Sequence, residues 1–338
     1  MQLATATPND RQELGDFLVN AFLTHGGEPF YFLDRLPHLF TDDRIGEHSI
    51  ARENGKIIGC VGAYRFDLMH KGIAFDACGI GQVGTAPEAR GKGVMQALMK
   101  AAIEKNADCD FFWLYGERRR YGYHGFELGG QYTEYCFTKR YLQKLVPAIS
   151  PSINVSIKYD TILPKLQATS TYLELSPDER QYCFDGKALK VLSTDHAQIV
   201  YSGNEQFIHY AWGEKSHLAA IFLHVIETYR EDDDVYHHVD EFEPTTHHTL
   251  LPHYTDATRE TSANYRIGNL STLLEKTAQL TPTKNYDLSQ VLSILSPLTP
   301  LQQSIAIFSP FTSQLPQGAF EETIPTLSDL HIPRIYAL

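Results

Sequence analysis

The chain has 338 residues, which is long for a single domain, and its 29 basic and 41 acidic side chains give a formal net charge of −12. By counting, the net is about −2 over residues 1–140 and about −10 beyond them, which argues against nucleic acid as a partner. We expect neither a membrane span nor a signal sequence, because the chain has no long apolar run and no charged-then-apolar start. The 5 cysteines have no paired spacing, which favours a reducing compartment and predicts a cytoplasmic location.

The first 85 residues predict a helix, a hairpin and a further strand. Thr7-Pro8-Asn9-Asp10 offers an N-cap, a proline at the first helical position and an acid in the first turn, and apolar residues then recur at helical spacing up to Phe22. Residues 49–53 and 56–64 flank Asn54-Gly55, a pair suited to a type I′ turn. Residues 74–85 are expected to form the next strand, so this part predicts antiparallel pairing.

A glycine-rich segment follows that strand. Val83-Gly84-Thr85-Ala86-Pro87 leads into Arg90-Gly91-Lys92-Gly93-Val94-Met95 and then into a helix. Glycines let the backbone pass close to a ligand, and the first N–H groups of the helix face that ligand with the positive end of the dipole. The spacing is neither that of a Walker loop nor that of a dinucleotide fingerprint. The segment therefore predicts a phosphate or pyrophosphate site, the alternative being a turn that only joins a strand to a helix.

A second segment lies downstream. Residues 111–115 are apolar and aromatic, as expected of a buried strand. The next segment is Arg120-Tyr121-Gly122-Tyr123-His124-Gly125-Phe126. Taken by itself, Tyr121 would be interpreted as a half-buried tyrosine of a helix with no catalytic role.

Together the two segments resemble the GNAT superfamily of N-acetyltransferases. Arg90, Gly93 and Met95 occupy the positions of its Gln/Arg-x-x-Gly-x-Gly/Ala signature, with Met95 in place of the usual small residue. Arg120 to Phe126 resembles its Phe/Arg-Tyr-x-x-x-Gly-Phe element. The resemblance implies an α/β (α+β) GNAT fold with a central mixed, mostly antiparallel sheet over residues 1–145, and acetyl-CoA as co-substrate.

The resemblance also implies roles for particular residues. Tyr121 would protonate the departing thiolate, and a backbone N–H near Val83 would stabilise the oxyanion. The base stays open: Glu28 is our candidate, with Glu117 and His124 as rivals. The residues expected to contact the cofactor are Val83, Thr85, Arg90, Gly91, Lys92, Gly93, Val94, Met95 and Arg118.

Residues 152–338 are expected to form a second region after a linker at 147–151. Strands are predicted at 188–193, 198–201 and 207–212, helices at 216–230 and 270–280, and a strand at 265–269 that runs into the second of these helices. No second glycine-rich loop of this kind occurs in the sequence. The layout is similar to the multi-domain enhanced intracellular survival proteins, and this similarity implies a degenerate GNAT-like α/β region with a helical tail.

Histidines at 237, 238, 247, 248 and 253 lie among acidic residues. Their spacing does not specify an ordered ligand set, so we predict a solvated loop and no metal.

The leading hypothesis from the sequence is an acetyl-CoA-dependent N-acetyltransferase that transfers the acetyl group directly to a primary amine of a small molecule or a lysine. The alternatives are a non-catalytic CoA-binding regulatory protein and an interaction scaffold with a vestigial acetyltransferase domain. The sequence does not decide the acceptor or whether the protein forms a homo-oligomer.

Overall fold

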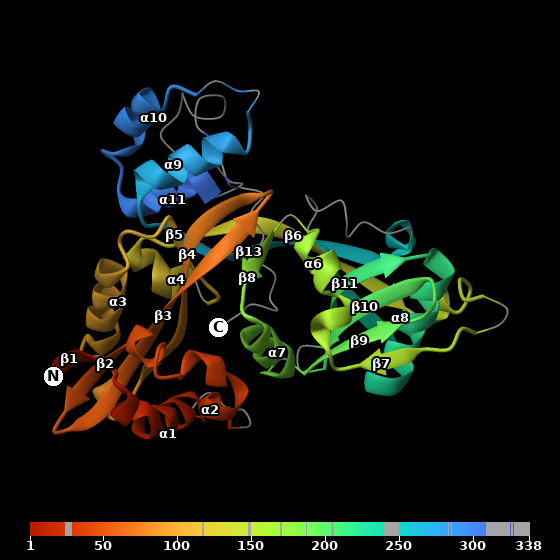
Figure 1. Cartoon of the computed structure of the whole chain (residues 1–338), viewed down its shortest axis with the longest axis horizontal. Coiled ribbons are helices and arrows are strands. Elements are labelled where there is room, and N and C mark those ends of the chain that lie inside the picture. The colour runs from red at the N-terminus through yellow and green to blue at the C-terminus, as the bar shows by residue number, and fades with distance from the viewer. Residues whose placement is uncertain are drawn as a thin grey trace.

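The computed structural model describes residues 1–23, 29–116, 118–147, 150–169, 171–186, 188–203, 206–230, 232–239, 250–282, 284, 286–308, 325 and 327. These residues form a 13-stranded sheet with the order β1-β2-β3-β4-β5-β13-β6-β12-β11-β10-β9-β7, and β8 pairs with the far end of β3. Figure 1 shows that the sheet runs through both halves of the chain and that α9, α10 and α11 gather together beside it.

The first half of the chain holds the elements up to α5. Its strands are β1 (Gln2–Thr5), β2 (His48–Glu53), β3 (Lys56–His70), β4 (Ile73–Thr85), β5 (Phe111–Leu114) and β6 (Glu127–Thr138). Its helices are α1 (Arg11–Leu23), α2 (Phe32–Arg35), α3 (Val94–Lys105), α4 (Arg118–Tyr121) and α5 (Lys139–Leu142).

The second half holds the remaining elements. Its strands are β7 (Asn154–Ser156), β8 (Thr171–Glu174), β9 (Leu189–Ser193), β10 (Ala197–Ser202), β11 (Phe207–Gly213), β12 (Asp234–Val239) and β13 (Asp256–Ile267). Its helices are α6 (Leu163–Gln167), α7 (Pro177–Gly186), α8 (Lys215–Tyr229), α9 (Leu270–Gln279), α10 (Leu288–Leu295) and α11 (Pro300–Phe308).

The predicted elements of the first 85 residues are confirmed, for local reasons. The Asp10 carboxylate accepts hydrogen bonds of 2.7 Å from the backbone N–H and from the hydroxyl of Thr7, just before α1 begins. Asn54 and Gly55 have φ values of 52° and 80°, the left-handed conformations that a type I′ turn between β2 and β3 requires. The expected mixed, mostly antiparallel sheet is therefore present.

Helices α1 and α3 cover opposite faces of the sheet. A Cβ added at Gly59 would contact side chains of α3, whereas one added at Gly84 would contact side chains of α1. Cys60 pairs with Gly84, so these two residues face the same side of the sheet. Gly59 precedes Cys60 in the chain, and because successive residues of a strand point to opposite faces, Gly59 faces the other side. An opening in this part of the sheet would therefore connect the face covered by α1 with the face covered by α3.

The second half repeats the topology of the first. Strands β2, β3 and β4 pair antiparallel, and α3 then leads to β5, which is parallel to β4. Strands β9, β10 and β11 also pair antiparallel, and α8 leads to β12, which is parallel to β11. In the repeat only Glu214, the N-cap of α8, lies between strand and helix, so the glycine-rich loop has no counterpart there.

Strand β13 joins the two halves. It pairs antiparallel with β5 on one side and with β6 on the other, so a strand of the second half lies inside the sheet of the first. The predicted strand at 265–269 and its capped helix correspond to the end of β13 and to α9, whose N-cap side chain, Asn269, accepts from the N–H groups of Ser271 and Thr272. The predicted division between residues 145 and 152 stays a prediction, and the sheet continues across it.

The prediction of a solvated loop is wrong for His237 and His238. Both are buried in β12, which lies between β6 and β11. His237 Nδ1 lies 3.0 Å from the carbonyl oxygen of Ile208, and His238 Nε2 lies 2.7 Å from the Glu134 carboxylate. Sheet pairing on both sides of β12 buries these polar side chains inside the protein, and the surrounding acids concealed this in the sequence. His247 and His248 lie outside the described residues.

Among the described helices, none is both long and apolar enough to cross a bilayer.

Candidate active site

An opening in the sheet lies between β4 and β5. The two strands pair in parallel only at Ala77–Phe111, Cys78–Phe112 and Gly79–Trp113. Beyond these pairs the strands separate, and a cleft of about 1410 Å³ lies where they part. Residues of both α1 and α3 line the cleft, so it reaches from one face of the sheet to the other.

The wall formed by β4 contains a β-bulge. Cys60 pairs with Gly84 and Gly62 pairs with Gly81, so two residues of β4, Gln82 and Val83, stand opposite one residue of β3. Gln82 has a φ of 45°, an uncommon value for a residue other than glycine. The bulge interrupts the regular alternation of β4 inside the cleft and presents Gln82 and Val83 to it.

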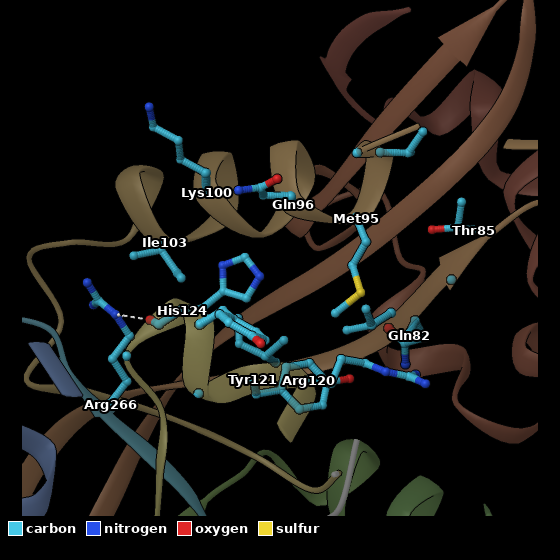
Figure 2. Close-up of a pocket in the computed structure, with 18 of the residues that line it drawn as sticks. Gln82, Thr85, Met95, Gln96, Lys100, Ile103, Arg120, Tyr121, His124 and Arg266 are labelled. Atoms are coloured by element: carbon cyan, nitrogen blue, oxygen red, sulfur yellow. Dashed lines mark hydrogen bonds between the residues drawn. The ribbon is translucent and has the colours of Figure 1, made fainter. Parts of the chain in front are cut away.

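The Gln82 side chain is buried without hydrogen bonds. It is 4% exposed, and neither its Oε1 nor its Nε2 has a partner among the residues that the structure describes. Leaving a buried polar group unsatisfied costs about 1–3 kcal/mol, so such groups call for an explanation. Figure 2 shows Gln82 in the wall of the cleft, where a bound ligand or water would satisfy its amide.

The glycine-rich loop and the start of α3 form one end of the cleft. Gly91 and Gly93 have φ values of 76° and 75°, and a Cβ added at either would meet nothing within 4 Å. Glycine is therefore needed here for its left-handed conformation, not for space. No side chain of the described residues caps α3, so its first N–H groups and the positive end of its dipole can face an anion.

Most of the predicted cofactor residues come together in this cleft. Lys92 does not line it, and its Nζ lies 3.8 Å from the Glu53 carboxylate. Arg118 lies in α4, but its side chain is outside the described residues, as are Glu28 and Glu117. Those that line the cleft are Val83, Thr85, Arg90, Gly91, Gly93, Val94 and Met95.

Tyr121 lines the opposite wall, at the end of α4. It is 7% exposed, and its ring lies edge-on to that of Phe126 at 6.4 Å. Gly116 allows this position, because a Cβ there would lie 2.5 Å from Cε2 of Tyr121. The loop is held from β13, whose Asn264 donates from Nδ2 to the carbonyl oxygen of Gly116 at 2.8 Å. The Tyr121 ring is therefore fixed by packing on both sides.

His124 and Arg266 lie together in a third part of the cleft, as Figure 2 shows. Arg266 of β13 donates from Nε to the carbonyl oxygen of His124 at 2.9 Å. Burial and the positive charge of Arg266 lower the pKa of His124 below its usual 6.5, so its imidazole is neutral at pH 7. Our sequence reasoning missed Arg266, since only the insertion of β13 brings it to this loop.

Among the residues with described positions, no group of three or more histidine, cysteine or acidic side chains is arranged to hold a metal ion.

The fold and the cleft define the class of protein. A sheet that opens between two parallel strands, with an anion-binding helix start on one side and a buried tyrosine on the other, is the architecture expected of GNAT acetyltransferases. Residues 3–129 match the family model described as the acetyltransferase (GNAT) domain. The amino-terminal part of the chain is a GNAT acetyltransferase domain.

Solved structures with this fold extend the likeness beyond that domain. A GCN5-related N-acetyltransferase from Kribbella flavida is 16% identical, with a TM-score of 0.56 over 79% of this chain and 70% of that one. A GCN5-related N-acetyltransferase from Anabaena variabilis is 18% identical, with a TM-score of 0.58 over 81% and 74%. Eis1 from Mycobacterium abscessus is 14% identical, with a TM-score of 0.56 over 81% and 75%. At these identities the likeness concerns the fold alone. No curated protein matches the sequence of this chain.

Proposed function

We propose that this protein is an N-acetyltransferase that transfers the acetyl group of acetyl-CoA directly to a primary amine of a small molecule or a lysine. The observation that carries the proposal is the convergence of three features in one cleft: the glycine loop at the start of α3, the bulge of β4 and the buried Tyr121. The family match of residues 3–129 supports acetyl transfer as the reaction class.

The loop and β4 would bind the cofactor. The N–H groups from Gly91 to Met95 and the exposed guanidinium of Arg90 would hold the pyrophosphate. Among the described strands, none lies beside β4 on the β5 side from Ile80 onward, so this backbone would be able to pair with the amides of the pantetheine arm. This arrangement would direct the thioester toward the bulge.

Transfer then requires an oxyanion donor and an acid. The amine nitrogen attacks the thioester carbon, a C–N bond forms, the C–S bond breaks, and the thiolate takes a proton. The N–H of Val83, turned by the bulge, would donate to the oxyanion, and the Tyr121 hydroxyl would protonate the thiolate. The orphaned amide of Gln82 would hold the incoming amine or a water that carries its proton away.

The proton acceptor stays open between Glu28, Glu117 and His124, and Glu117 lies outside the described residues. Glu28 remains our candidate base but lies outside the described residues. His124 lines the cleft and its lowered pKa leaves a neutral imidazole near pH 7, but it lies beside Ile103 and away from Gln82 (Figure 2), so it could take the proton only through water. The acceptor would enter on the α1 side of the sheet, where Ala21 and Phe22 line the cleft.

The experiment is turnover of acetyl-CoA with a panel of primary amines, scored by release of free thiol and by the mass of the product. We expect acetylated amine with the wild-type chain and a kcat at least tenfold lower for Tyr121→Phe, with unchanged affinity for acetyl-CoA. Binding of acetyl-CoA with no product from any amine would favour a CoA-binding regulatory protein instead. A cytoplasmic location is part of the proposal, and the buried free thiols of Cys60, Cys78 and Cys109 support it.

A further inference from the structure

The charged side chains that line the cleft are mostly basic, although the whole chain has a formal net charge of −12. Among the described residues they are Arg90, Lys100, Arg120 and Arg266, with Glu104 as the acid. The Glu104 carboxylate lies 3.7 Å from Lys100 Nζ, so this acid is matched by a cation of its own helix. Apart from this pair the described lining is basic, which favours anionic ligands over cationic ones.

These cations lie in different parts of the cleft. Arg90 belongs to the glycine-rich loop, where the pyrophosphate would bind. Figure 2 shows Arg266 and Lys100 toward one end of the cleft, and Arg120 and Gln82 toward the other. Gln82 belongs to the bulge at which the thioester would be placed. Arg120 is therefore the described cation on the side where the acetyl group would be transferred.

The Arg120 side chain has no partner of its own in the described part of the chain. It is exposed and lines the cleft, and no hydrogen bond or ion pair joins its guanidinium to another described residue. By contrast, Arg44, Arg52 and Arg65 each pair with two carboxylates. Arg120 directly precedes Tyr121 in α4, so their Cα atoms lie about 3.8 Å apart. A guanidinium next to the proposed acid is thus available to a ligand.

The amide of Gln82 is a second group without a partner at this end. Its side chain is buried, and both of its polar atoms lack hydrogen bonds to the residues that the structure describes. Figure 2 shows the Gln82 amide and the Arg120 guanidinium extending into the same end of the cleft. The amide oxygen can accept from an amine, and a guanidinium binds a carboxylate through two parallel N–H donors. The two side chains therefore suit a molecule that carries both groups.

An apolar surface borders the cleft on the α1 side. Phe22 lines the cleft and is exposed, and the centre of its ring lies 5.1 Å from that of Phe32. Phe30 is also exposed, and its ring centre lies 4.7 Å from that of Phe32. Exposed aromatic rings beside a pocket favour contact with an apolar part of a ligand.

We propose that the acceptor is a free amino acid with an apolar side chain, whose carboxylate binds Arg120 while Gln82 holds its amine for attack on the thioester. This inference rests on the proposed function, because it takes acetyl transfer to an amine as the reaction. In an α-amino acid one carbon joins the amine and the carboxylate, so both groups enter the same end of the cleft. The amine nitrogen forms the C–N bond as the C–S bond breaks, the thiolate takes a proton, and the carboxylate is unchanged in the N-acetyl amino acid.

The test compares acceptors with and without the negative charge, on the full chain. Phenylalanine, leucine and methionine would be assayed with acetyl-CoA beside their amides, and phenylalanine also beside phenethylamine, which lacks the carboxylate. Spermidine and a lysine peptide complete the panel, and release of free thiol and the mass of the product measure turnover. We expect the wild type to have a kcat/KM at least about tenfold higher for an amino acid than for its amide, mainly through a lower KM.

Variants of Arg120 test the assignment to this residue. Arg120→Gln should remove most of the preference by raising the KM for the amino acid, with little change for the amide, and Arg120→Lys should keep part of it. Arg140→Gln is the matched control, because Arg140 is an exposed residue of α5 that does not line the cleft. Its preference should equal that of the wild type. Calorimetric titration should give the same affinity for acetyl-CoA, within about threefold, in all four proteins.

Three results would overturn the inference and leave the proposed function intact. The first is a wild type that acetylates the amides, phenethylamine, spermidine or the peptide as well as it acetylates the amino acids. The second is an equal loss for amino acid and amide in Arg120→Gln, and the third is weaker binding of acetyl-CoA in that variant. The comparison of acceptors on the wild type needs no variant, so it decides even where Arg120→Gln does not fold. No product from any amine of the panel would refute the proposed function, and the inference with it.

Discussion

The position of the Tyr121 ring depends on the absence of a side chain at Gly116, and this dependence can be tested directly. A Cβ at residue 116 would lie 2.5 Å from Cε2, 3.3 Å from Cδ2 and 3.4 Å from Cζ of Tyr121. Ordinary contact begins near 3.5 Å, so Gly116→Ala has to move the ring by about 1 Å. A misplacement of this size at a reacting group costs about a hundredfold in rate. We therefore expect kcat to fall by about ten- to a hundredfold in this variant.

The effect should be confined to the chemical step. The glycine loop that would hold the pyrophosphate belongs to a different segment, so the affinity for acetyl-CoA should change by less than about threefold. Gly122→Ala is the matched control, since a Cβ at this neighbouring position meets nothing within 4 Å. Steady-state kinetics with a fixed amine and calorimetric titration with acetyl-CoA measure the two quantities. Full activity in Gly116→Ala, or an equal loss in Gly122→Ala, would refute this reasoning.

Three other predictions follow from the same structure. Gly93→Ala should weaken acetyl-CoA binding severalfold and lower the free energy of unfolding by about 1 kcal/mol, because φ is 75° at this residue. The control is Gly46→Ala, where an added Cβ would meet only Cγ2 of Thr5, at 3.8 Å, so neither quantity should change. Calorimetric titration measures the binding, and urea unfolding measures the stability. Gln82→Leu should lower kcat but leave the melting temperature equal or higher, since it removes a buried amide without partners; a melting temperature lower by several degrees would contradict this. Burial lowers the pKa of His38 and of His48 to about 4 from 6.5, so the unfolded chain takes up protons that the native state refuses, and the free energy of unfolding should fall by about 5 kcal/mol between pH 6.5 and 4. Urea unfolding at several pH values would give the slope of the unfolding free energy against pH. His48→Gln should reduce this slope by the equivalent of up to one bound proton.

The parts of the fold that depend on neighbouring residues could be predicted from the sequence. The Thr7–Asp10 cap and the Asn54-Gly55 turn are local, and the structure has both. The glycine-rich loop and the segment of Tyr121 were recognisable together, by their joint resemblance to the GNAT motifs. The structure brings most of the predicted cofactor residues into one cleft with Tyr121, because β4 and β5 carry them to the point where the sheet opens.

The parts that depend on distant pairing could not be predicted. Strand β13 lies between β5 and β6, more than a hundred residues from either in the chain, and only tertiary pairing brings Asn264 and Arg266 to the loop of Tyr121. The burial of His237 and His238 has the same origin, since β12 lies between β6 and β11 in the sheet. A polar pattern in one segment carries no information about such partners.

We expect the cleft between β4 and β5 to bind acetyl-CoA through the glycine loop at the start of α3. Calorimetric titration of acetyl-CoA into the purified full chain, alongside the double variant Gly91→Glu/Gly93→Glu, tests it most directly. We expect micromolar binding to the wild type that is lost in the variant, because two carboxylates and two strained residues would occupy the anion site. No binding to the wild type, or equal binding to a folded double variant, would contradict it.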